Sequence, residues 1–254
     1  MISAGIDIGS LTAKCVLLED SRILAYSVQK VRPKLEETAE EVFQETLKIA
    51  GLKREEVFRV FSTGYGRSRV RFAEKAVTEI TCHAVGAHFL IPTVKTVIDI
   101  GGQDSKVIAV ENGRVLNFAM NDKCSAGTGR FLEVMAAALN LKVEKLGEIA
   151  LKASKKITIS STCTVFAESE VISYISAGER VEEIVAGICD AIASRIAALA
   201  SRVGVREDVV LTGGVAKNLG VKKALEEKLG VKIKVPEEPQ IVGALGAAVL
   251  AMRG

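Results

Sequence analysis

The N-terminal segment of the chain is repeated later without an insertion or a deletion. Residues 98–116 match residues 6–24 at a constant offset of 92, with eight identities in nineteen positions. Both copies begin with Ile-Asp-Ile-Gly, and Lys14 of the first copy corresponds to Lys106 of the second. Because each copy reads as a strand, a glycine turn and a second strand, the repeat predicts two similar lobes that face each other.

The composition fits an ordinary globular α/β protein. The 254 residues are 48% hydrophobic and 26% charged, which leaves room for two lobes with their own cores. The net charge of +3, the lack of Trp and an aromatic content of 4% give no support to nucleic-acid binding. We expect neither a membrane span nor a signal peptide, because no apolar run is long enough and a strand begins at once. An odd count of five cysteines favours reduced thiols and a cytoplasmic location.

The hydrophobic pattern predicts strands and helices in both halves of the chain. Strands are expected at 2–8, 13–18, 23–28 and 57–61, within a second meander over 94–118, and at 157–161 and 209–211. Helices are expected at 35–50, 84–90, from 129 onward, and at 164–176, 182–203 and 243–252. With Pro92 as a helix breaker, these elements predict lobe I at 1–92 and lobe II at 93–242. The helix at about 243–254 is expected to pack back on lobe I.

An aspartate ends the first strand of each repeat. Asp7 can hold a magnesium ion directly or through water, and the N–H groups of residues 9–12 can cradle a phosphate. A single turn of this kind is usually only a β-hairpin, but two facing copies can clamp the β- and γ-phosphates of a nucleotide. Lys14 or Lys106 could also reach a phosphate, although lysines on strands are more often solvated.

A third glycine turn, Thr212 to Asn218, follows a buried strand and precedes a helix. Its glycines allow a ring or a ribose to approach the backbone. Together with the two Asp turns, it resembles the actin, heat-shock protein 70 and sugar kinase superfamily. The resemblance implies a duplicated, two-lobe, ribonuclease H-like α/β fold, the actin-like ATPase fold, with Asp7, Asp99 and Gln103 as candidate catalytic residues. The nucleotide-binding residues that it implies are Gly9, Ser10, Leu11, Thr12, Lys14, Gly101, Gly102, Gly213, Gly214, Lys217 and Gln240.

Two of the cysteines lie in polar turns. Cys124 and Cys163 each precede a predicted helix, where the helix dipole and free N–H groups stabilise a thiolate. The other three, Cys15, Cys82 and Cys189, are expected to be buried small hydrophobes. Without a CxxC motif, one chain has no obvious four-thiolate cage, whereas a two-fold dimer would supply two from each chain. The histidines His83 and His88, five residues apart, make a poor zinc pair, and core or surface roles are expected.

Seven segments resemble the ATP-dependent activators of 2-hydroxyacyl-CoA dehydratases, relatives of the benzoyl-CoA reductase ATPase subunits (BadF/BadG/BcrA/BcrD type). They are GIDIGS, STGYGR, VIDIGGQDSK, NDKCSAGTGRF, SSTCTVFAESEVIS, LTGGVAKN and VGALGAA. The resemblance implies a homodimer that holds one [4Fe–4S] cluster through Cys124 and Cys163 of each chain. It also implies binding of ATP or ADP with Mg²⁺, held by Asp7 and Asp99.

The activity that this resemblance implies is electron transfer driven by ATP hydrolysis. Reduced ferredoxin or flavodoxin would be the donor, and a 2-hydroxyacyl-CoA dehydratase or a double-cubane-cluster reductase the low-potential acceptor. Two other classes stay open. A small-molecule or sugar kinase would need a further carboxylate base and would leave the cysteines idle, and a nucleotide sensor would bind partners without hydrolysis.

Overall fold

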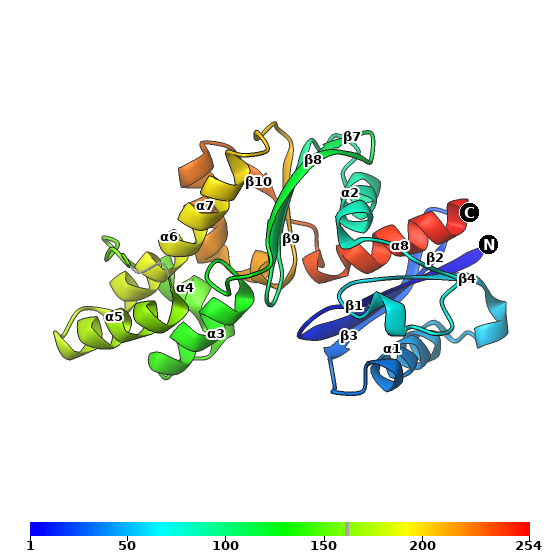
Figure 1. The fold of residues 1–254 in the computed structure, drawn as a ribbon, viewed down its shortest axis with the longest axis horizontal. Coiled ribbons are helices and arrows are strands. Elements are labelled where there is room, and N and C mark those ends of the chain that lie inside the picture. The colour runs from blue at the N-terminus through cyan, green and yellow to red at the C-terminus, as the bar shows by residue number, and fades with distance from the viewer. Residues whose placement is uncertain (161–162) are drawn as a thin grey trace.

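Two five-stranded mixed sheets form the framework of the computed structural model, which describes residues 1–160 and 163–254 (Figure 1). The first sheet, in the order β3-β2-β1-β4-β5, contains β1 (Ile2–Ile8), β2 (Thr12–Glu19), β3 (Arg22–Lys30), β4 (Val57–Thr63) and β5 (Lys75–Ala76). The second, in the order β8-β7-β6-β9-β10, contains β6 (Thr96–Ile100), β7 (Ser105–Glu111), β8 (Arg114–Asn121), β9 (Val209–Thr212) and β10 (Ile233–Lys234).

The two sheets have the same connectivity, as the sequence repeat predicts. In each, three antiparallel strands are followed by two strands that pair in parallel. The cross-strand register places Lys14 opposite Asp7 in the first sheet and Lys106 opposite Asp99 in the second. Facing residues in an antiparallel pair lie close enough to interact. The identity of these four residues in the repeat therefore has a structural reason.

Helices α2 (Glu79–Leu90) and α8 (Val242–Arg253) lie between the two sheets (Figure 1). Helix α8, at the C-terminal end of the chain, packs on β1, β2 and β4, while α2 packs on the second sheet through Ala84 and Ala87. The two helices also pack on each other through glycines. A methyl group on Gly246 would overlap the carbonyl oxygen of Cys82, so only a residue without a side chain fits at this crossing. This close contact joins the two sheets.

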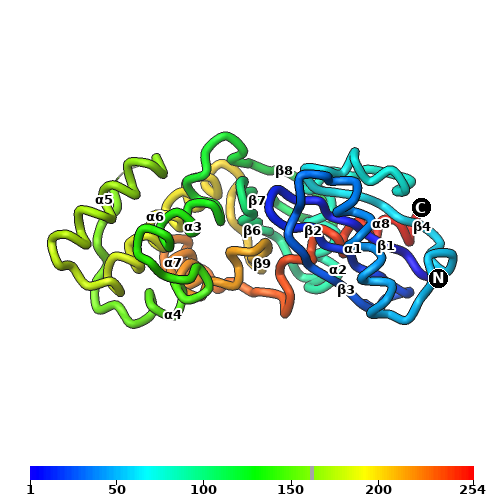
Figure 2. Tube along the Cα trace, turned by 90° about the horizontal axis from the view of Figure 1, so that it is seen from below, coloured from blue at the N-terminus to red at the C-terminus, as the bar shows by residue number. Residues whose placement is uncertain are grey.

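The outer faces of both sheets are covered by the remaining helices. Helix α1 (Leu35–Ala50) covers the first sheet with Val42, Phe43 and Leu47 and ends at Gly51, which has a φ of 68°. The second sheet is covered by α6 (Val181–Ala200), with α7 (Leu219–Leu229) and the short α4 (Leu146–Ala150) packed beside it. Helices α3 (Gly129–Ala138) and α5 (Thr164–Ser176) pack together at the end of the molecule away from the first sheet (Figure 2).

Most of the predicted elements are confirmed, with differences at their ends. Helices α1 and α5 have the predicted bounds, whereas α2 begins five residues earlier than expected because the Thr78 side chain caps it. The predicted strand at 157–161 is wrong. Residues 157–160 form no strand, and the Ile157 N–H donates to the Glu183 carbonyl of α6 instead of to another strand. Residues 161 and 162 lie outside the described residues.

The helices of the described residues were compared with what a membrane-spanning helix requires. None of them combines the length and the apolar composition that are needed to cross a bilayer.

Candidate functional site

Three turns that are far apart in the sequence line one cavity of about 760 Å³. Gln103 is exposed and does not line it. The other residues that the sequence predicts for nucleotide binding and catalysis all do: Asp7, Gly9, Ser10, Leu11, Thr12, Lys14, Asp99, Gly101, Gly102, Gly213, Gly214, Lys217 and Gln240. The fold therefore brings the predicted set together, with both lobes contributing, and only Gln103 stands apart.

The two Asp turns are closed by the same backbone hydrogen bond. In the first lobe, the Gly9 N–H donates to the Thr12 carbonyl at 3.0 Å. In the second, the Gly101 N–H donates to the Asp104 carbonyl, also at 3.0 Å. These positions correspond at the offset of 92. The duplication thus extends from sequence to the hydrogen bond that shapes each turn, and it leaves a curved backbone of the kind that binds anions.

Each repeated lysine pairs with the aspartate of its own lobe. Lys14 Nζ lies 3.1 Å from Asp7 Oδ2, and Lys106 Nζ lies 3.2 Å from Asp99 Oδ2. All four side chains are largely buried. The two lysines are therefore engaged with carboxylates in this structure rather than free in solvent.

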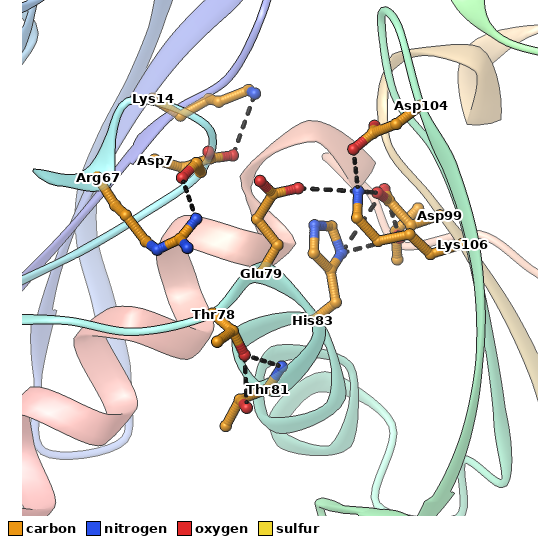
Figure 3. Close-up of polar contacts among 12 residues, drawn as sticks. Asp7, Lys14, Arg67, Thr78, Glu79, Thr81, His83, Asp99, Asp104 and Lys106 are labelled. Carbon is orange, nitrogen blue, oxygen red and sulfur yellow. Dashed lines mark hydrogen bonds and ion pairs between the residues drawn. The ribbon is translucent and has the colours of Figure 1, made fainter. Parts of the chain in front are cut away.

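Lys106 also binds two further carboxylates that come from other parts of the cleft. Its Nζ lies 2.7 Å from Asp104 Oδ2 and 2.8 Å from Glu79 Oε2 (Figure 3). Burial would lower the pKa of Lys106, but the three surrounding carboxylates raise it above its ordinary value. For Glu79, burial raises the pKa, and the attraction of Lys106 only partly opposes this. Lys106 is thus held charged, while Glu79 binds a proton more readily than an exposed glutamate.

The carboxylates of the cleft outnumber its lysines. Four acidic groups lie with two ammonium groups, a set that we call the carboxylate cluster: Asp7, Glu79, Asp99, Asp104, Lys14 and Lys106. The Arg67 side chain also lies beside Asp7, which leaves four acidic groups with three cations (Figure 3). Such a surplus of buried negative charge favours a bound cation, and magnesium prefers oxygen ligands. The residues present therefore fit a magnesium ion held by Asp7 and Asp99 together with nucleotide phosphates.

Asp99 is the most constrained of these carboxylates. It accepts a hydrogen bond of 3.1 Å from the Thr212 hydroxyl and lies 3.6 Å from His83 Nδ1. Burial alone would raise the pKa of Asp99, but the attraction of a protonated His83 and of Lys106, with hydrogen bonds from Lys106 and Thr212, lowers it to about 2. Asp99 therefore stays ionised, as a metal ligand must.

Glu79 and His83 belong to the site, although the sequence did not assign them to it. Both come from the first turns of α2, line the cavity and point toward the carboxylate cluster (Figure 3). We expected His83 to have a core or surface role. Its ring is buried, but it lies on the cavity wall, because α2 passes between the two sheets. No periodicity marks this helix as part of a site, since its apolar residues are distributed around all of its sides.

The turn after β9 forms the third wall. Gly213 has a φ of 84°, and a methyl group there would overlap the Ile100 carbonyl, so glycine is required. Its N–H donates to the Pro239 carbonyl at 3.0 Å, which brings Gln240 beside the turn. Lys217 is half exposed and pairs with Glu238 at 2.8 Å. This wall offers glycine backbone and a polar edge to a ribose or a base.

The two turns with exposed cysteines lie against each other. In the first turn, the Asn121 side chain donates to the Cys124 carbonyl at 2.7 Å and accepts from the Cys124 N–H at 3.2 Å. Ser125 and Thr164, the residues that follow Cys124 and Cys163, share a hydrogen bond of 2.9 Å between their hydroxyls. Both cysteines are free and exposed. Within the described residues, no group of three or more His, Cys, Asp or Glu side chains forms a metal site.

A direct connection joins the second Asp turn to the first cysteine turn. The Gly129 N–H donates to the Gly101 carbonyl, and the Arg130 N–H donates to the Gly102 carbonyl, each at 2.8 Å. These are the first N–H groups of α3, which lack intrahelical partners, and the Thr128 side chain does not cap them. The cavity wall itself therefore satisfies the start of the helix that follows Cys124.

The other three cysteines are buried, as the sequence predicts. Cys15, Cys82 and Cys189 are at most 1% exposed, and burial raises the pKa of each thiol to about 12. They therefore act as small hydrophobes. Only Cys124 and Cys163 present sulfur at the surface.

Comparison with known proteins identifies the family. The sequence profile of the BadF/BadG/BcrA/BcrD ATPase family matches residues 4–251. The chain therefore belongs to the BadF/BadG/BcrA/BcrD ATPase family. Within it, the (R)-2-hydroxyglutaryl-CoA dehydratase activating ATPase of Acidaminococcus fermentans is 53% identical over 251 residues, which cover 98% of this chain and 96% of the relative.

Solved structures confirm the fold for this member of the BadF/BadG/BcrA/BcrD family. The crystal structure of Acidaminococcus fermentans (R)-2-hydroxyglutaryl-CoA dehydratase component A has a TM-score of 0.97 at 51% identity and covers 100% of this chain and 98% of that chain. The activator of the 2-hydroxyisocaproyl-CoA dehydratase from Clostridium difficile, with bound ADPNP, has a TM-score of 0.95 at 45% identity and covers 100% and 95%. The predicted family and two-lobe fold are confirmed.

The sugar kinase alternative receives support only at the level of fold. A ROK family glucokinase from Streptomyces griseus has a TM-score of 0.62 at 14% identity and covers 100% of both chains. At this identity the likeness concerns the arrangement of the lobes and not the substrate.

The lowered pKa of Asp99 predicts a change in acid stability, measured without magnesium or nucleotide. A carboxylate with a depressed folded pKa stabilises the fold above its unfolded pKa, and the contribution is lost as the pH falls through the folded pKa. Here the loss falls between about pH 4 and pH 2. In Asp99→Asn, the free energy of unfolding should fall less steeply over this range than in the wild type. Asp20→Asn, in an exposed turn, is the control. Equal slopes for Asp99→Asn and the wild type would contradict the assignment.

Proposed function

We propose that this protein is a homodimeric, ATP-dependent activator that passes one electron at low potential to a partner enzyme, such as a 2-hydroxyacyl-CoA dehydratase. The ATPase part rests on the family, and the activator part on relatives named for activation, among them an activator of lactoyl-CoA dehydratase from Anaerotignum propionicum. A related reductase is the alternative partner, since one of the benzoyl-CoA reductase subunits of Thauera aromatica is 36% identical to this chain.

The observation that carries the proposal is the direct connection between the nucleotide cavity and the cysteine turns. The Gly101–Gly102 turn lines the cavity and accepts both hydrogen bonds from the start of α3. Cys124 precedes this helix by a few residues, and the hydrogen bond between Ser125 and Thr164 continues the path to the second cysteine turn. A shift of the turn on nucleotide binding would therefore move both cysteines.

The cavity walls have distinct roles in the proposed ATP site. The N–H groups of the two Asp turns would bind phosphate oxygens, and Asp7 and Asp99 would hold Mg²⁺, which neutralises phosphate charge when bound. The Gly213–Gly214 backbone, with Lys217 and Gln240 nearby, would bind the adenosine.

Glu79 is the carboxylate of the cluster that is best suited to accept a proton. Burial raises its pKa, and it faces the cavity from the first turn of α2. We therefore assign it the role of taking a proton from the attacking water. Gln103 lies on the second Asp turn but is exposed, so its catalytic role requires that this turn move when nucleotide binds.

The exposed cysteines fit a shared [4Fe–4S] cluster rather than a site within one chain. A cube of this kind needs four thiolates, and each chain offers two at its surface. A two-fold axis beside Cys124 and Cys163 would supply all four. When bound there, the cluster would supply a one-electron carrier.

Helix α5, which begins beside Cys163, has a surface suited to a second copy of the chain. Val165 and Phe166 are 65% and 68% exposed, and Ile172 is half exposed on the same helix. The nearby serines, Ser169 and Ser173, donate to main-chain carbonyls of their own helix, so their hydroxyl groups are already hydrogen-bonded. Burying this face would stabilise a dimer.

We propose a cytoplasmic location, which the free thiols support. All five cysteines are free, which is typical of the reducing cytoplasm. Because a one-electron cluster needs a one-electron donor, we propose reduced ferredoxin or flavodoxin, as the resemblance to the dehydratase activators implies. ATP would drive the transfer by binding two conformations of the dimer unequally.

Cysteine variants test the cluster assignment. In anaerobically purified wild type, we expect about four irons and four sulfides per dimer. Cys124→Ser and Cys163→Ser should each lose the cluster and electron transfer while keeping nucleotide affinity, since neither residue lines the cavity. Cys189→Ala, at a buried thiol, is the control and should keep the iron. Full iron content in both serine variants would refute the ligand assignment.

A proline variant tests the connection between the cavity and the cysteines. Gly129 is the first residue of α3, where proline is well tolerated, and Thr128 has the extended backbone that precedes proline readily. Gly129→Pro removes the N–H that donates to Gly101, whereas Gly129→Ala adds a side chain and keeps it. The measurement is the rate at which a chelator extracts iron with ADP or with a non-hydrolysable ATP analogue bound.

The wild type and the alanine variant should show different rates with the two nucleotides. The proline variant should show nearly equal rates, each measured at saturating nucleotide because Gly129 lines the cavity. A full difference in the proline variant would show that this hydrogen bond does not transmit the nucleotide state.

A further inference from the structure

The hydrogen bonds around Thr212 determine which nitrogen of His83 carries a proton. The Thr212 hydroxyl has one hydrogen, and it donates this to the carboxylate of Asp99 at 3.1 Å. The same hydroxyl oxygen lies 3.1 Å from His83 Nδ1. Because its hydrogen is already used, this second bond requires Nδ1–H as the donor. In the neutral ring, Nε2 is then an acceptor.

That acceptor nitrogen faces the aspartate of the other lobe. A methyl group placed on Gly243 would lie 3.0 Å from His83 Nε2 and 3.3 Å from Asp7 Oδ2, so both atoms border one small space. The imidazole lone pair and the carboxylate oxygen are both acceptors. Asp7 Oδ2 already accepts a hydrogen bond from Lys14 at 3.1 Å, and Nε2 borders the same space on the cavity wall. A water molecule in this space can donate one hydrogen to Nε2 and the other to the Asp7 carboxylate.

From these contacts, we propose that His83 is a positioning residue for ATP hydrolysis, whose Nε2 accepts a hydrogen bond from a water molecule held against Asp7. The inference rests on the proposed function of the cavity. The ring is fixed at Nδ1 by the Thr212 hydroxyl, which in turn donates to Asp99 of the second lobe. At Nε2 the ring would accept a hydrogen bond from a water molecule that also contacts the Asp7 carboxylate of the first lobe. The ring thus ties this water to both Asp turns at once.

The position of the ring in the fold supports this role over that of an ordinary core histidine. His83 is 6% exposed, yet it lines the cavity, and its neighbours on α2 at Cys82 and Ala84 are fully buried and apolar. Both of its nitrogens face polar groups of the site. A histidine that only filled space in the core would not need polar groups beside both ring nitrogens.

Two amide variants separate the functions of the two nitrogens. The side-chain nitrogen of His83→Asn can replace Nδ1 and keep the bond to Thr212, but the variant has no acceptor at the position of Nε2. His83→Gln is longer, and its amide oxygen can reach that position. His88→Asn, on the same helix but outside the cavity, is the matched control.

The experiment measures kcat and KM for Mg-ATP hydrolysis, calorimetric affinity for Mg-ADP, and melting temperature. In His83→Asn, kcat should fall by about 10- to 100-fold, while KM and the affinity for Mg-ADP stay within about twofold. His83→Gln should recover part of the loss, and His88→Asn should match the wild type.

Three results would overturn the inference. One is wild-type kcat in His83→Asn, which would show that Nε2 is not needed. Another is a loss of Mg-ADP affinity and melting temperature in parallel with kcat in both His83 variants, which would show a purely structural role. A wild type that does not hydrolyse Mg-ATP at all would overturn the proposed function, and this inference with it.

Discussion

The carboxylate cluster between the two sheets is the feature on which the rest of the site depends. Four acidic side chains are held in the cleft by two lysines, and buried charges of this kind are costly unless they are paired. Because the cluster draws Asp7 from one lobe, Asp99 from the other and Glu79 from the helix between them, its charge balance depends on how the lobes lie. Any cation or phosphate that enters the cavity changes this balance. A nucleotide bound in the cleft would therefore change the charge balance that holds the two lobes in their relative position.

The second lobe carries this response to the surface. Its Asp turn uses backbone carbonyls to bind the start of α3, so the wall of the cavity is hydrogen-bonded directly to the helix after Cys124. The first lobe has a turn of the same shape, but there the chain continues into α1 and carries no cysteine turn. Duplication thus supplied two halves of a nucleotide clamp, and the segment added after the second copy supplied the cysteines. In the proposed function, the same 2.8 Å hydrogen bonds that complete α3 would make the cysteine turn sensitive to the clamp.

The sequence predicted the clamp and the cysteines but not the residues between them. Asp7 and Asp99 are recognisable because a repeat at fixed offset must preserve the register of its strands, and Lys14 and Lys106 follow from the same register. His83 and Glu79 leave no such trace. They lie on a helix whose apolar residues form no distinct face, and their role arises only because α2 passes between two sheets that the sequence does not place relative to each other. The strand predicted at 157–161 failed for a similar reason, since α6 takes the place of a partner strand.

The central claim is that the state of the nucleotide reaches the electron carrier at the cysteine turns. The most direct test is the midpoint potential of the iron–sulfur cluster in anaerobically purified dimer, with Mg-ADP and then with magnesium and a non-hydrolysable ATP analogue. For one electron, a tenfold change in equilibrium corresponds to about 59 mV. The account predicts two potentials that differ by at least about this amount, because hydrogen bonding and solvent exposure at Cys124 and Cys163 change with the clamp. Identical potentials, with both nucleotides shown to be bound, would contradict it.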